Sequence, residues 1–113
     1  MPKTLTTISA DDLKEALESD HPPVVINTLS REAHEAKHIP GSINVPTDKI
    51  DQVETLVPNK DALIAVYCAN ADCTASLAAA QTLEEMGYTN VMDFEDGYAG
   101  WRQAGYPLTG EEA

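Results

Sequence analysis

Two cysteines, Cys68 and Cys73, are the residues whose types and spacing most directly suggest chemistry. An apolar run, residues 63–67, leads into Cys68, and an Ala-rich run, residues 75–86, stops at Gly87. This pattern predicts a buried strand, a short loop and a helix, with Cys68 where the strand ends. Backbone N–H groups at a helix start favour anions and would favour the nucleophilic thiolate of such a cysteine. The alternative is that Cys68 is a small buried apolar side chain.

Cys73 follows Cys68 by five residues, and its role is open at this point. If the loop curls, the two sulfurs approach disulfide range, and Cys73 would resolve an oxidised form of Cys68, such as a sulfenic acid, to a disulfide. Otherwise Cys73 packs as an inert side chain between sheet and helix. We expect no metal site, because two thiolates are too few for structural zinc and the three histidines would have to converge on the loop. We expect no cofactor.

The length, composition and net charge of the chain limit the class of protein to which it can belong. The 113 residues suit one domain, residues 1–113, with a core built from aliphatic side chains because aromatic content is only 5%. With 19 acidic and 7 basic residues, the formal net charge is -12, which argues against nucleic-acid or anionic-membrane partners. No apolar stretch approaches the roughly 20 residues that span a membrane, and residues 1–4 lack a signal-peptide core. We therefore expect a cytoplasmic protein.

The secondary-structure elements around the two cysteines must hold these residues in position. The predicted elements alternate between strand and helix along the chain. Apolar runs predict further strands at residues 5–8, 24–29, 43–46 and 91–92. Helical spacing and capping residues predict helices after Ser9, from Ser30 to about Lys37, and after Thr47 or Asp48. The remaining expectations are a last helix with Tyr98, Trp101 and Ala104 on one face, ended by Gly105, and a frayed tail, residues 110–113. Alternation of this kind indicates a parallel sheet covered on both faces.

Five ordered segments carry a resemblance to a known family. They are the strand Val24-Val25-Ile26-Asn27, the segment His38-Ile39-Pro40-Gly41-Ser42-Ile43-Asn44-Val45-Pro46, the strand end Val66-Tyr67-Cys68, the segment Gly87-Tyr88-Thr89-Asn90-Val91, and the Glu95-Asp96-Gly97 turn with Trp101 and the exit Ala104-Gly105-Tyr106-Pro107-Leu108. Over nearly its whole length the chain resembles the rhodanese-like domain superfamily. The resemblance implies a five-stranded, mainly parallel α/β sheet with helices on both faces, and an active-site cysteine at Cys68.

The implied activity is sulfurtransferase chemistry. In that family a cysteine thiolate attacks a sulfur donor, holds the sulfane sulfur as a persulfide, and passes it to a thiophilic acceptor. In this chain the backbone amides that would surround the sulfur belong to Ala69, Asn70, Ala71, Asp72, Cys73 and Thr74. The partners implied are a small sulfur donor, a thiol acceptor, or the persulfide of another protein.

The loop after Cys68 differs from the common family pattern. It is two residues longer, has no Gly and no basic residue, and contains Asp72. Asn27 replaces the usual Asp, and Leu29 stands where Arg is common. A dianion such as thiosulfate prefers a bidentate Arg, and Asp72 would repel it, so neither thiosulfate specificity nor phosphatase activity is expected. Two other functions remain open: a non-catalytic rhodanese-like binding module, and a dithiol redox protein that uses Cys68 and Cys73.

Overall fold

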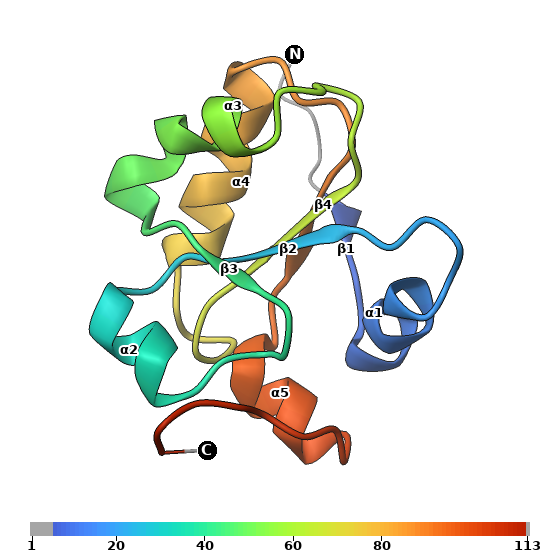
Figure 1. Cartoon of the computed structure of the whole chain (residues 1–113), viewed down its shortest axis with the longest axis vertical. Coiled ribbons are helices and arrows are strands. Elements are labelled where there is room, and N and C mark those ends of the chain that lie inside the picture. Colours follow the sequence, from blue (N-terminus) through green and yellow to red (C-terminus); the bar gives the residue numbers. More distant parts are fainter. Residues whose placement is uncertain (1–5, 113) are drawn as a thin grey trace.

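The structure is a computed structural model that describes residues 6–112, and Figure 1 shows its α/β architecture. The elements in chain order are β1 (Thr6–Thr7), α1 (Ala10–Leu17), β2 (Val24–Asn27), α2 (Arg31–Ala36), β3 (Ile43–Asn44), the 3-10 helix η1 (Thr47–Gln52), α3 (Val53–Leu56), β4 (Ile64–Tyr67), α4 (Ala75–Glu85), β5 (Val91–Phe94) and α5 (Gly97–Gln103). The sheet order is β1-β5-β4-β2-β3, and all four strand pairings are parallel. The predicted fold class, a five-stranded mainly parallel sheet with helices on both faces, is confirmed.

The two faces of the sheet bury separate clusters of side chains. Successive side chains of a strand point to opposite faces, so Ile64 and Val66 lie on one side of β4 and Ala65 and Tyr67 on the other. The first face is covered by η1, α3 and α4, and the second by α1 and α5. The central strand β4 is therefore buried on both faces, as its continuous apolar sequence predicts.

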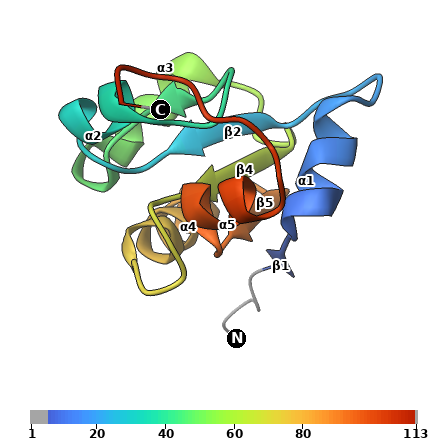
Figure 2. The ribbon, with the colours of Figure 1, turned by 90° about the horizontal axis from the view of Figure 1, so that it is seen from below.

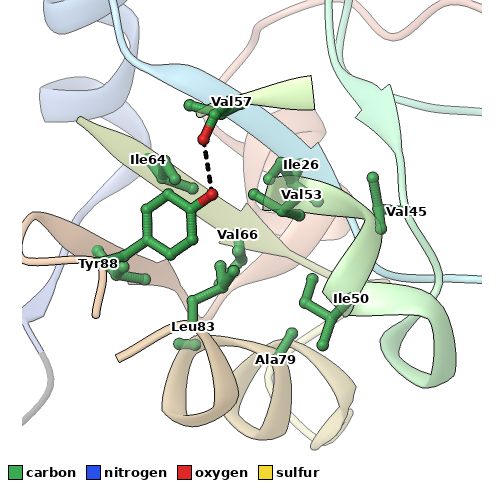
Figure 3. Close-up of a cluster of buried hydrophobic side chains, with 12 residues drawn as sticks. Ile26, Val45, Ile50, Val53, Val57, Ile64, Val66, Ala79, Leu83 and Tyr88 are labelled. Atoms are coloured by element: carbon green, nitrogen blue, oxygen red, sulfur yellow. Dashed lines mark hydrogen bonds between the residues drawn. The ribbon is translucent and has the colours of Figure 1, made fainter. Parts of the chain in front are cut away.

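Figure 3 shows the first of these clusters, between the sheet and α4. Leu83 from α4 and Val53 from α3 are fully buried there, and each such side chain contributes about 1.5–3 kcal/mol relative to exposure. Tyr88 adds a polar contact, because its hydroxyl donates to the Val57 carbonyl at 2.6 Å. This packing fixes α4 against β4, and so fixes the loop that joins them.

Two of the three predicted helix caps are present in the structure, and the third is absent. Ser9 and Ser30 cap α1 and α2 as predicted, since their hydroxyl oxygens accept from Asp12 N at 3.1 Å and Ala33 N at 3.2 Å. The predicted cap at Thr47 or Asp48 is wrong. There η1 begins after Pro46 without a side-chain cap.

The Thr47 hydroxyl is used elsewhere, because it donates to the Ala75 carbonyl of α4 at 3.0 Å. The predicted helix after Thr47 is also not one regular helix, since a 3-10 turn precedes the short α3. Leu56, the last residue of α3, is 52% exposed. A tertiary contact to α4 therefore sets the start of this segment in place of the local cap.

The structure near both ends of the described chain differs from the sequence-based predictions. The first strand is β1, Thr6–Thr7, whereas Leu5 lies outside the described residues. The expectation of a frayed tail is wrong for residues 110–112. The Glu111 and Glu112 amides donate to the Glu35 and Ala36 carbonyls at 2.9 and 2.7 Å, so the tail returns to α2, as Figure 2 shows. Ala113 lies outside the described residues.

No helix within residues 6–112 is long and apolar enough to cross a membrane.

Candidate active site

Cys68 directly follows the central strand β4 and is completely buried. Its carbonyl accepts from Tyr98 N at 3.0 Å, and the Ala69 carbonyl accepts from Ala99 N at 3.0 Å. The start of α5 is therefore hydrogen-bonded to the chain at the point where β4 becomes a loop. Residues 69–74, which we call the cysteine loop, connect this point to α4.

Gly97, the first residue of α5, makes this close approach possible. A Cβ atom at Gly97 would lie 2.6 Å from both Ala69 C and Asn70 N, and its φ of +65° is one that L side chains rarely adopt. Sequence reasoning placed Gly97 in a turn but did not assign it to the site. The available signal was its position immediately before the last predicted helix, in the turn that resembles the family pattern.

Asn70 folds the cysteine loop back on itself. Its side-chain oxygen accepts from Asp72 N at 3.0 Å, and its carbonyl accepts from Cys73 N at 3.1 Å. Asn70 and Asp72 are both exposed, and neither caps α4. Two of the six amides predicted to surround a sulfur ligand, those of Asp72 and Cys73, thus donate within the loop. The assignment of these six residues to substrate binding remains a prediction.

The folded loop brings the two cysteines together. Cys68 and Cys73 form a disulfide, with Cα atoms 6.3 Å apart. This confirms that a curled loop brings the sulfurs into disulfide range. Cys73 is half-buried whereas Cys68 is fully buried, so Cys73 is the more accessible of the two.

A buried carboxyl group lies under the first turn of α4, next to the end of the cysteine loop. Asp93 of β5 is 4% exposed, and its Oδ1 atom has no hydrogen-bond partner among the described residues. Burial raises the pKa of Asp93 above its ordinary value; a hydrogen bond from Ser76 lowers this pKa, and the charge of Glu95 raises it further. The prediction began a strand at residues 91–92 but assigned no role to Asp93, because nothing in the local sequence indicated that this acid is buried.

A cluster of hydrogen-bonded residues lies beside the site, at the end of β2. We call it the tyrosine network, and it consists of Asn27, Ile39, Ser42 and Tyr67. The Tyr67 hydroxyl accepts from Ile39 N at 3.0 Å and from Asn27 Nδ2 at 3.1 Å, and it shares a 2.8 Å hydrogen bond with Ser42 Oγ. Burial raises the pKa of Tyr67, although the hydrogen bonds from Ser42, Asn27 and Ile39 act in the opposite direction. Asn27, which replaces the family's usual Asp, is therefore a structural donor here.

His38, in the segment between α2 and β3, contacts the end of α2, since its Nδ1 atom is 2.6 Å from the His34 carbonyl. Its ring stacks on that of His34, with centroids 3.9 Å apart. Within residues 6–112, no group of three or more His, Cys, Asp or Glu side chains is arranged to hold a metal ion.

The fold and the site together define a parallel α/β domain with a cysteine at the carboxyl end of its central strand. The family model for the rhodanese-like domain matches residues 9–104. The chain belongs to this family, as its sequence resemblance predicted.

Two curated relatives are larger proteins. The HTH-type transcriptional regulator Rv0324 of Mycobacterium tuberculosis is 32% identical over 74% of this chain and 36% of its own length. The adenylyltransferase and sulfurtransferase uba4 of Ogataea parapolymorpha is 29% identical over 77% of this chain and 22% of its own. The chain thus spans about a third or less of the length of these relatives.

A solved structure extends the similarity to the whole fold. The thiosulfate sulfurtransferase of Pseudomonas aeruginosa has a TM-score of 0.85 and 25% identity, and the match covers 94% of this chain and 20% of that one. The domain is homologous to sulfurtransferase domains.

Proposed function

We propose that the domain is a sulfurtransferase that carries sulfane sulfur as a persulfide on Cys68. The observation that carries the proposal is the position of Cys68 at the end of the central strand, directly before a loop and a helix N-terminus. The family membership supports it, as do the sulfurtransferase names of two similar proteins.

The reaction begins after the Cys68–Cys73 disulfide is reduced. The Cys68 thiolate attacks the sulfane sulfur of a donor, and the donor group leaves with the bonding electron pair. The outer sulfur of the resulting persulfide is then attacked by an acceptor thiolate, which restores the Cys68 thiolate. Backbone N–H groups of the cysteine loop that are not engaged by Asn70 are the donors available to the persulfide anion.

The charge of the loop selects the kind of donor. Residues 69–74 contain no Lys or Arg, and the Asp72 side chain is exposed beside Cys73. A dianion such as thiosulfate has no bidentate partner there and is repelled by the carboxylate. We therefore assign the donor to the class of thiol persulfides, either of a small molecule or of a partner protein, and the acceptor to the class of thiols.

Intact-mass spectrometry tests the proposal. Reduced Cys73→Ser protein, which retains Cys68 as its only cysteine, is incubated with thiosulfate, benzenethiosulfonate or glutathione persulfide, with Cys68→Ser as the control. The expected result is a gain of one sulfur atom that Cys68→Ser does not show, with thiosulfate the poorest donor. No gain with any donor, in protein shown by circular dichroism to be folded, would overturn the proposal and favour a non-catalytic binding module.

The Cys68–Cys73 disulfide favours a second candidate, a dithiol redox protein. In that case a disulfide-exchanging partner would convert the reduced protein to a form lighter by two hydrogens, with no sulfur gained at any time. A persulfide that forms on Cys68 in a Cys73→Ser variant would argue against redox exchange as the only activity.

A further inference from the structure

We propose that Cys73 discharges the Cys68 persulfide within the chain, so that the domain releases sulfide and ends as the Cys68–Cys73 disulfide. This inference rests on the proposed function, because it requires a persulfide on Cys68. It assigns to Cys73 a further catalytic role and adds an activity, the reduction of sulfane sulfur to sulfide.

The cysteine loop presents Cys73 to Cys68 through contacts that do not need the disulfide. The turn around Asn70 is closed by backbone and side-chain hydrogen bonds to Asp72 and Cys73. On the other side, α5 holds the carbonyls of Cys68 and Ala69 in place. None of these hydrogen bonds involves a sulfur atom, so they do not depend on the disulfide and would hold the Cys73 sulfur next to the Cys68 sulfur when the latter carries a persulfide.

The two cysteines also differ in exposure, because Cys68 is fully buried and Cys73 is half-buried. Cys68 has no exposed surface, so a bulky acceptor reaches its inner sulfur poorly. The Cys73 sulfur belongs to the same loop and approaches the inner sulfur directly, as the disulfide shows. Intramolecular attack of this kind has the advantage of high effective concentration over an external thiol.

The step balances without an external oxidant. The Cys73 thiolate attacks the Cys68 Sγ atom, a bond forms between the two Sγ atoms, and the bond from Cys68 Sγ to the outer sulfur breaks. The outer sulfur leaves with the electron pair as hydrosulfide and takes up the proton that Cys73 lost. The sulfane sulfur is reduced and the two cysteine sulfurs are oxidised, which accounts for both electrons.

A thiol reductant must then restore the dithiol. Attack at the half-buried Cys73 sulfur is easier than attack at the buried Cys68 sulfur, because access decides which sulfur of a disulfide is attacked. A mixed disulfide at Cys73 leaves Cys68 as the free thiolate, ready for the next donor.

The test uses reduced, reductant-free protein under anaerobic conditions with benzenethiosulfonate as the donor. The donor leaves as a sulfinate, so any sulfide must come from the protein persulfide. The wild-type protein is expected to release one sulfide for each donor consumed and to lose two hydrogens, at a rate independent of protein concentration. Cys73→Ser is expected to keep the added sulfur and to lose sulfide release, and Cys68→Ser is expected to show neither.

The outcomes separate this inference from the function on which it rests. A wild-type persulfide as long-lived as that of Cys73→Ser, or equal sulfide release by both, would overturn the role of Cys73 and leave the carrier function standing. No sulfur gain in Cys73→Ser, with a folded protein by circular dichroism, would overturn the carrier function itself. Cys73→Ala serves as a second variant if the serine protein does not fold.

Discussion

The tyrosine network and the cysteine loop both lie at the edge of the sheet where β2 and β4 end, yet they are held in different ways. The tyrosine network beside β2 is buried and joins residues up to 40 positions apart, such as Asn27 and Tyr67. The cysteine loop after β4 is largely exposed, and its internal hydrogen bonds span two or three residues around Asn70. One region depends on long-range contacts and the other on local contacts, a disulfide and the anchor at Gly97.

This difference assigns separate tasks to the two regions. Buried, satisfied polar groups specify one arrangement, because a lost partner leaves a costly unpaired group. A local exposed loop can change its covalent state with little effect on the core. The tyrosine network therefore fixes the ends of β2 and β4, whereas the cysteine loop can alternate between dithiol, persulfide and disulfide states.

The largest expected effect comes from the anchor that joins the cysteine loop to the scaffold. Gly97→Ala places a Cβ 2.6 Å from the backbone of Ala69 and Asn70 and forces a left-handed φ. Together these should lower the free energy of unfolding by about 3 kcal/mol or more in urea titrations. Gly105→Ala is the matched control, because its φ is +96° but nothing lies within 4 Å, and it should cost only about 1–2 kcal/mol. Equal losses of stability at both sites would show that the close approach at Gly97 does not contribute to the cost.

The next effect tests the tyrosine network. Tyr67→Phe removes the hydroxyl that serves Ile39 N, Asn27 Nδ2 and Ser42 Oγ, and it should lower the free energy of unfolding by about 2–3 kcal/mol. Urea titration measures this. Tyr98→Phe is the control, because the Tyr98 hydroxyl makes no hydrogen bond with any residue from 6 to 112, and it should change stability by less than about 0.5 kcal/mol. A neutral Tyr67→Phe would mean that the network is not structurally important.

The disulfide should stabilise the oxidised protein less than the network does. Closing a loop as short as the one between Cys68 and Cys73 removes unfolded-state entropy worth about 2 kcal/mol at most in the chain-entropy treatment. Urea titrations with and without a phosphine reductant measure the difference. Cys73→Ser should be insensitive to the reductant. A larger loss on reduction would show that the disulfide supports the core as well as the loop.

The smallest effect concerns the buried acid under α4. The pKa of Asp93 is raised in the folded state, so its favourable contribution is present below the ordinary value of 3.8 and is lost as pH rises toward the folded-state value. Asp93→Asn should remove this decline and increase stability at neutral pH by about 1 kcal/mol. Thermal unfolding from acidic to neutral pH measures the change, and Asp72→Asn at an exposed site provides the control. A decline with rising pH that persists in Asp93→Asn would assign it to another group.

Much of the fold could be predicted from sequence, because the relevant signals are local. The apolar runs before Cys68 and at Val24–Asn27 gave buried strands, and Ser9 and Ser30 gave caps. The failures arose where tertiary contacts override local preference. Thr47 donates to α4 where a cap was expected, and the tail pairs with α2 where fraying was expected.

The candidate site was predictable in part for the same reason. The position of Cys68 follows from strand and helix periodicity, and the distance to Cys73 is short enough for sequence spacing to suggest a disulfide. Gly97, Tyr67 and Asp93 could not be assigned, because their partners come from other elements of the chain. Nothing in the local sequence of Asp93 distinguishes it from the exposed acids that dominate the composition.

The sequence by itself determined the order of strands and helices and the placement of a cysteine at the end of the central strand. These features follow from periodicity, capping and turn residues, which act over a few positions. Only the tertiary structure decided that Cys73 pairs with the buried Cys68, that α5 lies against the cysteine loop through Gly97, and that Asn27 serves the Tyr67 hydroxyl. Such contacts depend on packing between distant segments, which local preference does not encode.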